Sequence, residues 1–207
     1  KYFLKSNLIN EEFIDYQKDN KLLILKEGTH DIKEPLIIPN SHKFIINKNT
    51  NINFSGKGSI ISYSPIFLYG SEEDKIKIKG KKNSFNQSIL VINSKDSSYI
   101  SNTIFENLSS FNNNRWILPG AITFYNSPVE IKNSVFINNN SEDSLNLIKS
   151  KFLLSKNIFY NAPSDGLDID FSDGNINNLK IYGSGNDGLD LSGSNVNANN
   201  LEIIESN

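Results

Sequence analysis

The 207-residue sequence contains no cysteine and no methionine. Without cysteine the chain forms neither disulfides nor thiolate metal sites. Methionine is missing even at position 1, which predicts a processed or trimmed chain. The avoidance of cysteine suits an exported bacterial protein, although a cytosolic chain would look the same. We expect an extracellular, periplasmic or cell-surface location.

An excess of basic charge and long apolar runs are also missing. Lys and Arg together number 21 against 23 Asp and Glu, and the net charge is -2. This balance favours neither a nucleic-acid groove nor a basic membrane face. No apolar run reaches the length of a bilayer, and the opening residues lack the apolar region of a signal peptide. The sequence predicts a soluble domain without a nucleic-acid partner and without membrane insertion.

Alanine is scarce, whereas Asn, Ser, Ile and Lys are abundant, which favours short strands joined by polar turns. A repeat of 22 residues organises these strands, because Asp143, Asp165 and Asp187 lie 22 positions apart. Four further columns share this spacing: Leu145, Leu167 and Leu189; Leu147, Ile169 and Leu191; Ser150, Ser172 and Ser194; and Phe159, Ile181 and Ile203. Apolar residues alternate within each unit, which indicates strands. A repeat of this length predicts one coil of a parallel β-helix.

Three short strings carry a family resemblance. Asn102-Thr-Ile-Phe105, Asn133-Ser-Val-Phe136 and Asn157-Ile-Phe159 resemble the turn and strand of the pectate-lyase-like superfamily. The resemblance implies an all-β fold, a single-stranded right-handed parallel β-helix over residues 21–207, and contact with polysaccharide. It does not choose an activity, because such scaffolds host lyases, hydrolases, epimerases and inert adhesins.

The two ends of the repeat differ. Residues 10–20 begin with an Asn followed by two glutamates, a pattern typical of a helix N-terminus, so we expect a helical cap within residues 1–20. At the other end Leu201 and Ile203 lie in mid-coil and nothing amphipathic follows. An uncapped solenoid end exposes unpaired strand edges. We therefore expect further coils or a partner subunit there.

The regular spacing is interrupted between Asn102 and Asn133, which lie 31 positions apart. The extra residues, 107–119, contain Arg115 and Trp116, the only arginine and the only tryptophan of the chain. Insertions of this kind often carry function. Trp116 could stack on a sugar ring and Arg115 could bind a carboxylate or a phosphate. In the alternative interpretation, Trp116 and Ile117 fold back over the coil surface as a plug.

The densest acidic stretch is SDGLDIDFSDG, residues 164–174. If Leu167 and Ile169 point into the core, Asp168 points outward, and the one-coil shift places it between Asn146 and Asp190. Neighbouring strands lie about 4.8 Å apart. Two carboxylates at that distance repel by roughly 3 kcal/mol at an effective dielectric constant near 20. A compensating interaction is therefore expected.

Three interpretations of these carboxylates remain open. In the first, Asp165-Gly166 and Asp187-Gly188 are turns in which glycine supplies a positive φ, and the outward aspartates are solvated. In the second, carboxylates bind Ca²⁺, a cation that takes clustered oxygen ligands. The candidate calcium ligands are Asp168, Asp170, Asp187 and Asp190, with Asp173 as a possible helper. In the third, Asp168, Asp170 and Asp190 perform acid and base catalysis on a glycosidic bond.

These observations predict a β-helix domain that binds polysaccharide, with Ca²⁺ at the aspartates. The expected substrate-binding residues are Arg115, Trp116, Tyr125 and Asn146. One alternative is a lyase, hydrolase or epimerase acting on an acidic glycan, although no catalytic motif of the superfamily is found. The other is a passive stalk or adhesin segment of a larger protein.

Overall fold

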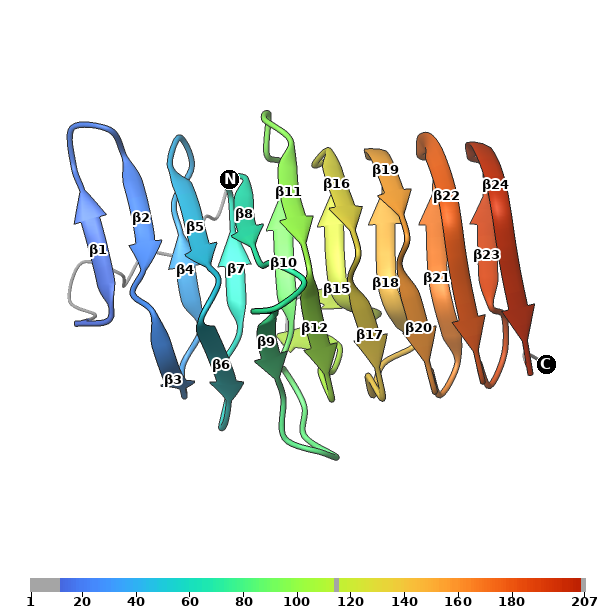
Figure 1. The fold of residues 1–207 in the computed structure, drawn as a ribbon, viewed down its shortest axis with the longest axis horizontal. Helices are drawn as coiled ribbons and strands as arrows, with labels where there is room; N and C mark the ends of the chain where they lie inside the picture. The colour runs from blue at the N-terminus through green and yellow to red at the C-terminus, as the bar shows by residue number, and fades with distance from the viewer. Residues whose placement is uncertain (1–11, 114–115, 206–207) are drawn as a thin grey trace.

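A computed structural model describes residues 12–113 and 116–205. These residues form about eight stacked coils that lie side by side along one axis (Figure 1). No helix occurs among the described residues, and none therefore is long and apolar enough to cross a membrane. The predicted class, an all-β solenoid with coils of about 22 residues, is confirmed.

Two long sheets and one hairpin contain all the strands. The fifteen-stranded sheet comprises β1 (Ile14–Gln17), β2 (Leu22–Leu25), β3 (Gly28–Ile32), β5 (Lys43–Asn47), β6 (Thr50–Phe54), β8 (Ile66–Tyr69), β9 (Ile76–Lys79), β11 (Ser98–Ser101), β12 (Thr103–Glu106), β16 (Val129–Lys132), β17 (Val135–Ile137), β19 (Lys151–Ser155), β20 (Ile158–Tyr160), β22 (Asp173–Tyr182) and β24 (Asn195–Ile204). The seven-stranded sheet comprises β4 (Leu36–Ile38), β7 (Ile60–Ser62), β10 (Ile89–Ile92), β15 (Gly120–Tyr125), β18 (Asp143–Ile148), β21 (Asp165–Asp170) and β23 (Leu189–Ser192). The hairpin comprises β13 (Phe111–Asn113) and β14 (Trp116–Leu118).

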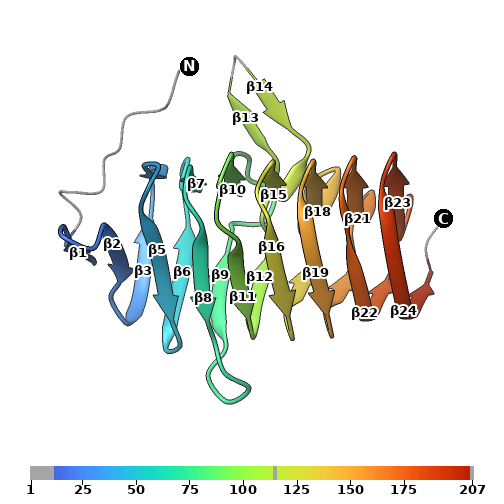
Figure 2. The ribbon, with the colours of Figure 1, turned by 90° about the horizontal axis from the view of Figure 1, so that it is seen from above.

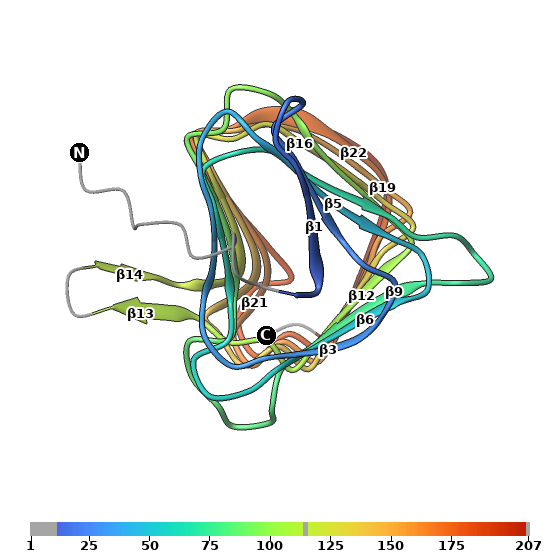
Figure 3. The same cartoon turned by 90° about the vertical axis from the view of Figure 1, so that its left-hand side faces the viewer.

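Seen along its axis, the solenoid has a three-sided outline (Figure 3). Its corners are residues with positive φ, mostly asparagines, as at Asn126, Asn133 and Asn138 in one coil. Asparagine tolerates this conformation because its short side chain can form local hydrogen bonds. The backbone amide of each corner donates to the next coil, as from Asn126 to the Ile148 carbonyl at 2.8 Å. The abundance of Asn thus serves the corners of the fold.

The predicted columns are confirmed in the interior. Leu145 pairs in register with Leu167, and Leu167 with Leu189. The rings of Phe136 and Phe159 stack with centroids 4.3 Å apart. Serines form a second ladder, in which each backbone N–H donates to the hydroxyl of the following coil: Ser94, Ser127, Ser150, Ser172 and Ser194. Each coil therefore covers the next with matching apolar and polar groups.

The expected helical cap is wrong for the part of it that the structure describes. Residues 12–20 form turns and strand β1, which pairs antiparallel with β2. Ile14 and Tyr16 alternate with polar Asp15 and Gln17, so this segment has one apolar face at period two. Ile14 is buried and Tyr16 packs against the core. The cap thus covers the edge of β2 as a strand, while residues 1–11 lie outside the described part.

Insertions lengthen more than one coil. The predicted insertion forms the β13–β14 hairpin, which projects sideways from the seven-stranded sheet (Figure 2). A second lengthening was not predicted: Ile60 pairs with Ile89, 29 positions later, because two connections in this coil, residues 70–75 and 80–88, are longer than their equivalents in the preceding coil. In the outermost coil, Leu191, Leu201 and Ile203 are exposed. The expectation of further coils or a partner beyond this coil stays a prediction.

Candidate carboxylate site

The predicted outward row runs across the seven-stranded sheet. Thr123 on β15 pairs with Asn146 on β18, Asn146 with Asp168 on β21, and Asp168 with Asp190 on β23. Thr123 and Asn146 are fully buried, whereas Asp168 and Asp190 are partly exposed. The backbone register thus brings together the residues that the 22-residue spacing predicted, and the row becomes more exposed toward the last coil.

Asn146 links two carboxylates. Its Nδ2 donates to Oδ2 of Asp168 at 2.6 Å and to Oδ2 of Asp143 at 3.1 Å. Asp143 is only 2% exposed. Because one amide nitrogen carries two N–H groups, it can serve both acceptors at once. The amide supplies part of the compensation that two neighbouring carboxylates require.

Both carboxyl groups hold their protons unusually tightly. The pKa of Asp143 is raised to about 8. Burial is the largest cause, and the negative charges of Asp168, Glu142 and Asp165 contribute to the same rise. Burial also raises the pKa of Asp168 to about 7, followed by repulsion from Asp170 and Asp190. The hydrogen bonds from Asn146 lower both pKa values, but less than burial raises them. Both carboxyl groups therefore change their protonation near neutral pH and not in the usual acidic range.

Three oxygen atoms along the row have no hydrogen-bond partner among the described residues. They are Oγ1 of Thr123, Oδ1 of Asn146 and Oδ1 of Asp168, all shielded from solvent by protein. A buried polar atom without a partner costs about 1–3 kcal/mol. Such atoms gather where a protein exchanges hydrogen bonds with water or with a ligand. The row therefore carries unused hydrogen-bonding capacity.

The first interpretation is wrong for Asp165-Gly166, which open strand β21 and do not form a turn, but the side chain of Asp165 does accept backbone and side-chain donors of the next coil. Its Oδ1 accepts hydrogen bonds from the backbone N–H of Asp187 and from Nδ2 of Asn186, both at 2.9 Å. The expected positive φ at Gly166 and Gly188 is wrong, since neither residue has one. Glycine is required at position 166 for space, because a Cβ there would lie 2.7 Å from the carbonyl oxygen of Gly188.

A candidate metal site lies beside the row. Asp165, Asp187 and Asp190 each offer a carboxylate oxygen, and these oxygens lie within 4.8 Å of one another. Carboxylate oxygens are the ligands that Ca²⁺ prefers. Of the predicted calcium ligands, the structure brings Asp187 and Asp190 into this group but not Asp168 or Asp170. Sequence reasoning had placed Asp165 in a turn only, although its column with Asp187 was visible.

The remaining predicted site residues are Tyr125 on β15 and Arg115 and Trp116 in the insertion. Tyr125 lies partly exposed at the end of β15, in register with Ile148, which in turn pairs with Asp170. Arg115 and the side chain of Trp116 lie outside the described residues. The plug interpretation is wrong for Ile117, which is 66% exposed, and is not tested for Trp116. Phe111 and Leu118 instead pack against the sheet.

Sequence reasoning missed two groups of residues. Asp143 was noticed only as a repeat position, because alternation from Leu145 assigns it to the interior. A surface cluster of Phe67, Tyr69 and Tyr99 on β8 and β11 was also missed. The alternation of Phe67 and Tyr69 along one strand could have indicated this cluster. Tyr99 was not connected with them, because it follows Phe67 by 32 positions and the repeat is 22 residues long.

Comparisons with known protein families, with curated proteins and with solved structures found no match. The resemblance to the pectate-lyase-like superfamily is therefore not confirmed by any relative. The β-solenoid fold is established by the geometry of the coils alone.

Proposed function

We propose that this protein binds polysaccharide across the outer surface of the seven-stranded sheet. The observation that carries the proposal is the row of polar side chains on adjacent strands, which reaches the molecular surface at Asp168 and Asp190. The partly exposed carboxylates of Asp168 and Asp190, on strands about 4.8 Å apart, can accept hydrogen bonds from successive sugar hydroxyls. Tyr125, Trp116 and Arg115 would contact the glycan beside the row.

Calcium would act at the exposed end of the row. Asp165, Asp187 and Asp190 would hold the ion, and its remaining coordination positions would accept sugar hydroxyl or carboxylate oxygens. Weak calcium sites suit extracellular modules, where dissociation constants of about 10⁻⁴–10⁻³ M suffice. The proposal therefore includes an extracellular, periplasmic or cell-surface location.

Affinity electrophoresis in gels containing neutral or acidic polysaccharides tests the binding, in calcium and in chelator. Asp168→Asn and Asp190→Asn should reduce retardation in the gel. Asp15→Asn is the matched control, since Asp15 is exposed on β1 far along the axis. If every glycan retards the wild type and both row variants equally, this face is excluded as the binding site.

A second candidate function is favoured by one specific observation, the pKa of Asp168 near 7. A carboxyl group that is partly protonated at neutral pH can donate a proton to a leaving oxygen. Asp190 or Asp170 would then act as base or nucleophile. Paired carboxyl groups about 5–5.5 Å apart are typical of retaining glycosidases.

This second function is tested by incubating the protein with acidic polysaccharides and measuring new reducing ends and unsaturated products. Asp168→Asn should abolish turnover, and the wild-type rate should fall as the pH rises through about 7, because Asp168 loses its proton there. Unaltered turnover in Asp168→Asn and Asp190→Asn would refute the assignment. Absence of both binding and turnover would leave the stalk interpretation.

A further inference from the structure

A second recessed surface lies at another corner of the solenoid. Only three residues, 63–65, connect β7 to β8, whereas five residues, 93–97, connect β10 to β11. The longer turn rises above its neighbour in Figure 1. Between this turn and the turn that follows β1 lies a cleft of about 790 Å³. The short connection therefore forms the floor of the cleft, and the longer turns form its walls.

The cleft is polar and carries ammonium groups. Lys21, Lys43 and Lys95 line it together with two carboxylates, Asp19 and Asp96. In the part of the chain that the structure describes, none of these lysines forms an ion pair. Side chains of asparagine and serine complete much of the lining. Such a surface offers charge and hydrogen bonds to a small anionic group.

His42 is held in one orientation at the cleft. Its Nδ1 lies 2.9 Å from the carbonyl oxygen of Asn40, which can only accept, so Nδ1 carries a hydrogen. Its Nε2 lies 3.3 Å from the hydroxyl of Tyr16. When Nδ1 carries the only ring hydrogen, the Tyr16 hydroxyl donates to Nε2. The backbone N–H of His42 also donates to Oγ of Ser64 in the next coil at 3.0 Å, so hydrogen bonds to the cap and to that coil order the wall near Lys43.

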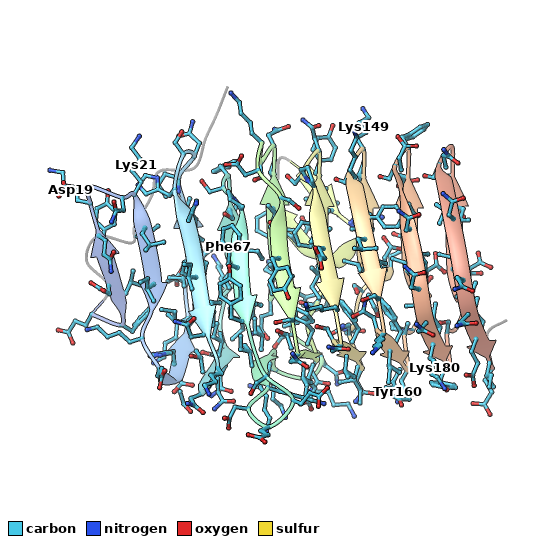
Figure 4. All side chains as sticks on the ribbon, turned by 45° about the horizontal axis from the view of Figure 1, so that its top comes forward. Asp19, Lys21, Phe67, Lys149, Tyr160 and Lys180 are labelled. Atoms are coloured by element: carbon cyan, nitrogen blue, oxygen red, sulfur yellow. The ribbon has the colours of Figure 1, made fainter. Side chains whose placement is uncertain are left out.

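An aromatic surface continues from the cleft along β8. Phe67 follows Pro65 of the cleft by two residues, about 7 Å of strand. The ring centroids of Tyr69 and Tyr99 lie 5.6 Å apart, and those of Phe67 and Tyr69 lie 6.1 Å apart. Tyr69 is 43% exposed. In Figure 4, Phe67 lies on the outer face below the edge that bears Asp19 and Lys21.

A cation completes this aromatic surface. The ammonium nitrogen of Lys132 lies 4.9 Å from the ring centroid of Tyr99. Exposed aromatic rings can stack on the apolar faces of sugar rings, while a neighbouring ammonium group can bind a carboxylate or a sulfate substituent. The aromatic rings of β8 and β11 therefore lie next to a cleft that carries ammonium groups without ion pairs.

We propose that the cleft and the aromatic surface together bind an anionic saccharide. A carboxylate or sulfate group lies among Lys21, Lys43 and Lys95, and the adjoining sugar rings stack on Phe67, Tyr69 and Tyr99. Sugar is favoured over an apolar protein partner because hydroxyl and amide groups dominate the cleft beside the rings. The site lies on different strands from the carboxylate row and has the opposite charge, so it does not rest on that row's function.

Isothermal titration calorimetry with oligogalacturonate, chondroitin sulfate and dextran tests the proposal. The two anionic probes should bind and neutral dextran should not. Tyr69→Ala and Tyr99→Ala should each weaken binding about tenfold. Lys43→Gln and Lys95→Gln should weaken it several-fold and reduce its dependence on salt. The controls are Tyr160→Ala, which changes a stacked tyrosine on β20, and Lys57→Gln, which changes an exposed lysine outside the cleft.

Either of two results would overturn the inference: no binding of the anionic probes, or equal affinity in the wild type and all four site variants. Asp168→Asn separates this site from the carboxylate row. If only Asp168→Asn lowers affinity, the row binds glycan and the cleft does not. If only the tyrosine and lysine variants lower affinity, the cleft binds the anionic saccharide and the function proposed for the row fails.

Discussion

The two halves of the seven-stranded sheet share one backbone geometry but carry opposite outer surfaces. On β4, β7 and β10 the outward residues are Ile37, Ile61 and Leu90, and the hairpin residues Phe111 and Leu118 pack against this cluster. On β18, β21 and β23 the equivalent positions are Asn146, Asp168 and Asp190. Apolar side chains on the outer face are thus covered by the same chain, whereas the polar row becomes partly exposed at Asp168 and Asp190.

The transition between the halves occurs at Thr123, which pairs with Leu90 on one side and Asn146 on the other. From there, polar groups become progressively more exposed. Burial at the covered end explains why Asp143 and Asp168 have raised pKa values, while Asp190 at the open end belongs to the candidate metal group. Position along one sheet therefore decides whether an acidic residue holds a proton or offers an oxygen to a cation.

The largest expected effect comes from placing a carboxylate in the covered half. Leu90→Asp should lower the free energy of unfolding by about 4 kcal/mol, because Leu90 is fully buried and the new charge would have no partner. Chemical denaturation followed by circular dichroism measures the loss. Ile117→Asp is the matched control, since Ile117 is exposed, and it should change stability by less than about 0.5 kcal/mol. Equal effects would show that the hairpin does not cover the sheet.

A smaller effect is expected from removing the most buried acid. The pKa of Asp143 rises from 3.8 to about 8 on folding, so the folded state binds the proton more tightly. Its contribution to stability is therefore complete below about pH 4 and is lost as the pH rises through 8. Between pH 5 and pH 8 the wild type should lose about 3.5 kcal/mol more than Asp143→Asn.

Unfolding curves measured across this pH range check the difference in slope. Glu72→Gln is the control, since Glu72 is exposed on a loop remote from the row, and it should leave the wild-type slope unchanged. A wild type whose stability rises from pH 5 to pH 8 relative to Asp143→Asn would contradict the raised pKa.

Much of the fold could be predicted because the 22-residue period lies in side chains that touch their own equivalents in the next coil. Leu167 and Ile169 indicated the interior, and this placed Asp168 beside Asn146 and Asp190 correctly. The cap could not be predicted as a strand, because an Asn followed by two glutamates resembles a helix start and outweighed the alternation in residues 13–17. The glycine after Asp165 was noticed, but the wrong reason was given for it. The spacing cannot show whether a glycine supplies a positive φ or makes room for the backbone of the next coil.

The site itself was less predictable than the fold. Periodicity states which residues share a row, but not which of them are covered by an insertion. The raised pKa of Asp143 depends on burial, and the bond from Asn146 depends on side-chain direction at the start of β18. The aromatic surface joins coils whose spacing is lengthened by insertions, so the repeat conceals it.

The smallest expected effect concerns calcium at the open end of the row. If Asp165, Asp187 and Asp190 bind the ion only in the folded state, calcium at ten times its dissociation constant should add about 1.4 kcal/mol to stability. Thermal melts in calcium and in chelator should therefore differ for the wild type and not for Asp187→Asn, whose exposed side chain can be changed without disturbing the coil. Asp173→Asn, also exposed, should keep the full shift. If calcium shifts the melting temperature of neither the wild type nor Asp173→Asn, the carboxylates of Asp165 and its neighbours do not bind the ion and serve only the local structure. If calcium shifts the melting temperature of Asp187→Asn as well but not that of Asp168→Asn, the ion lies within the row, where the sequence first placed it.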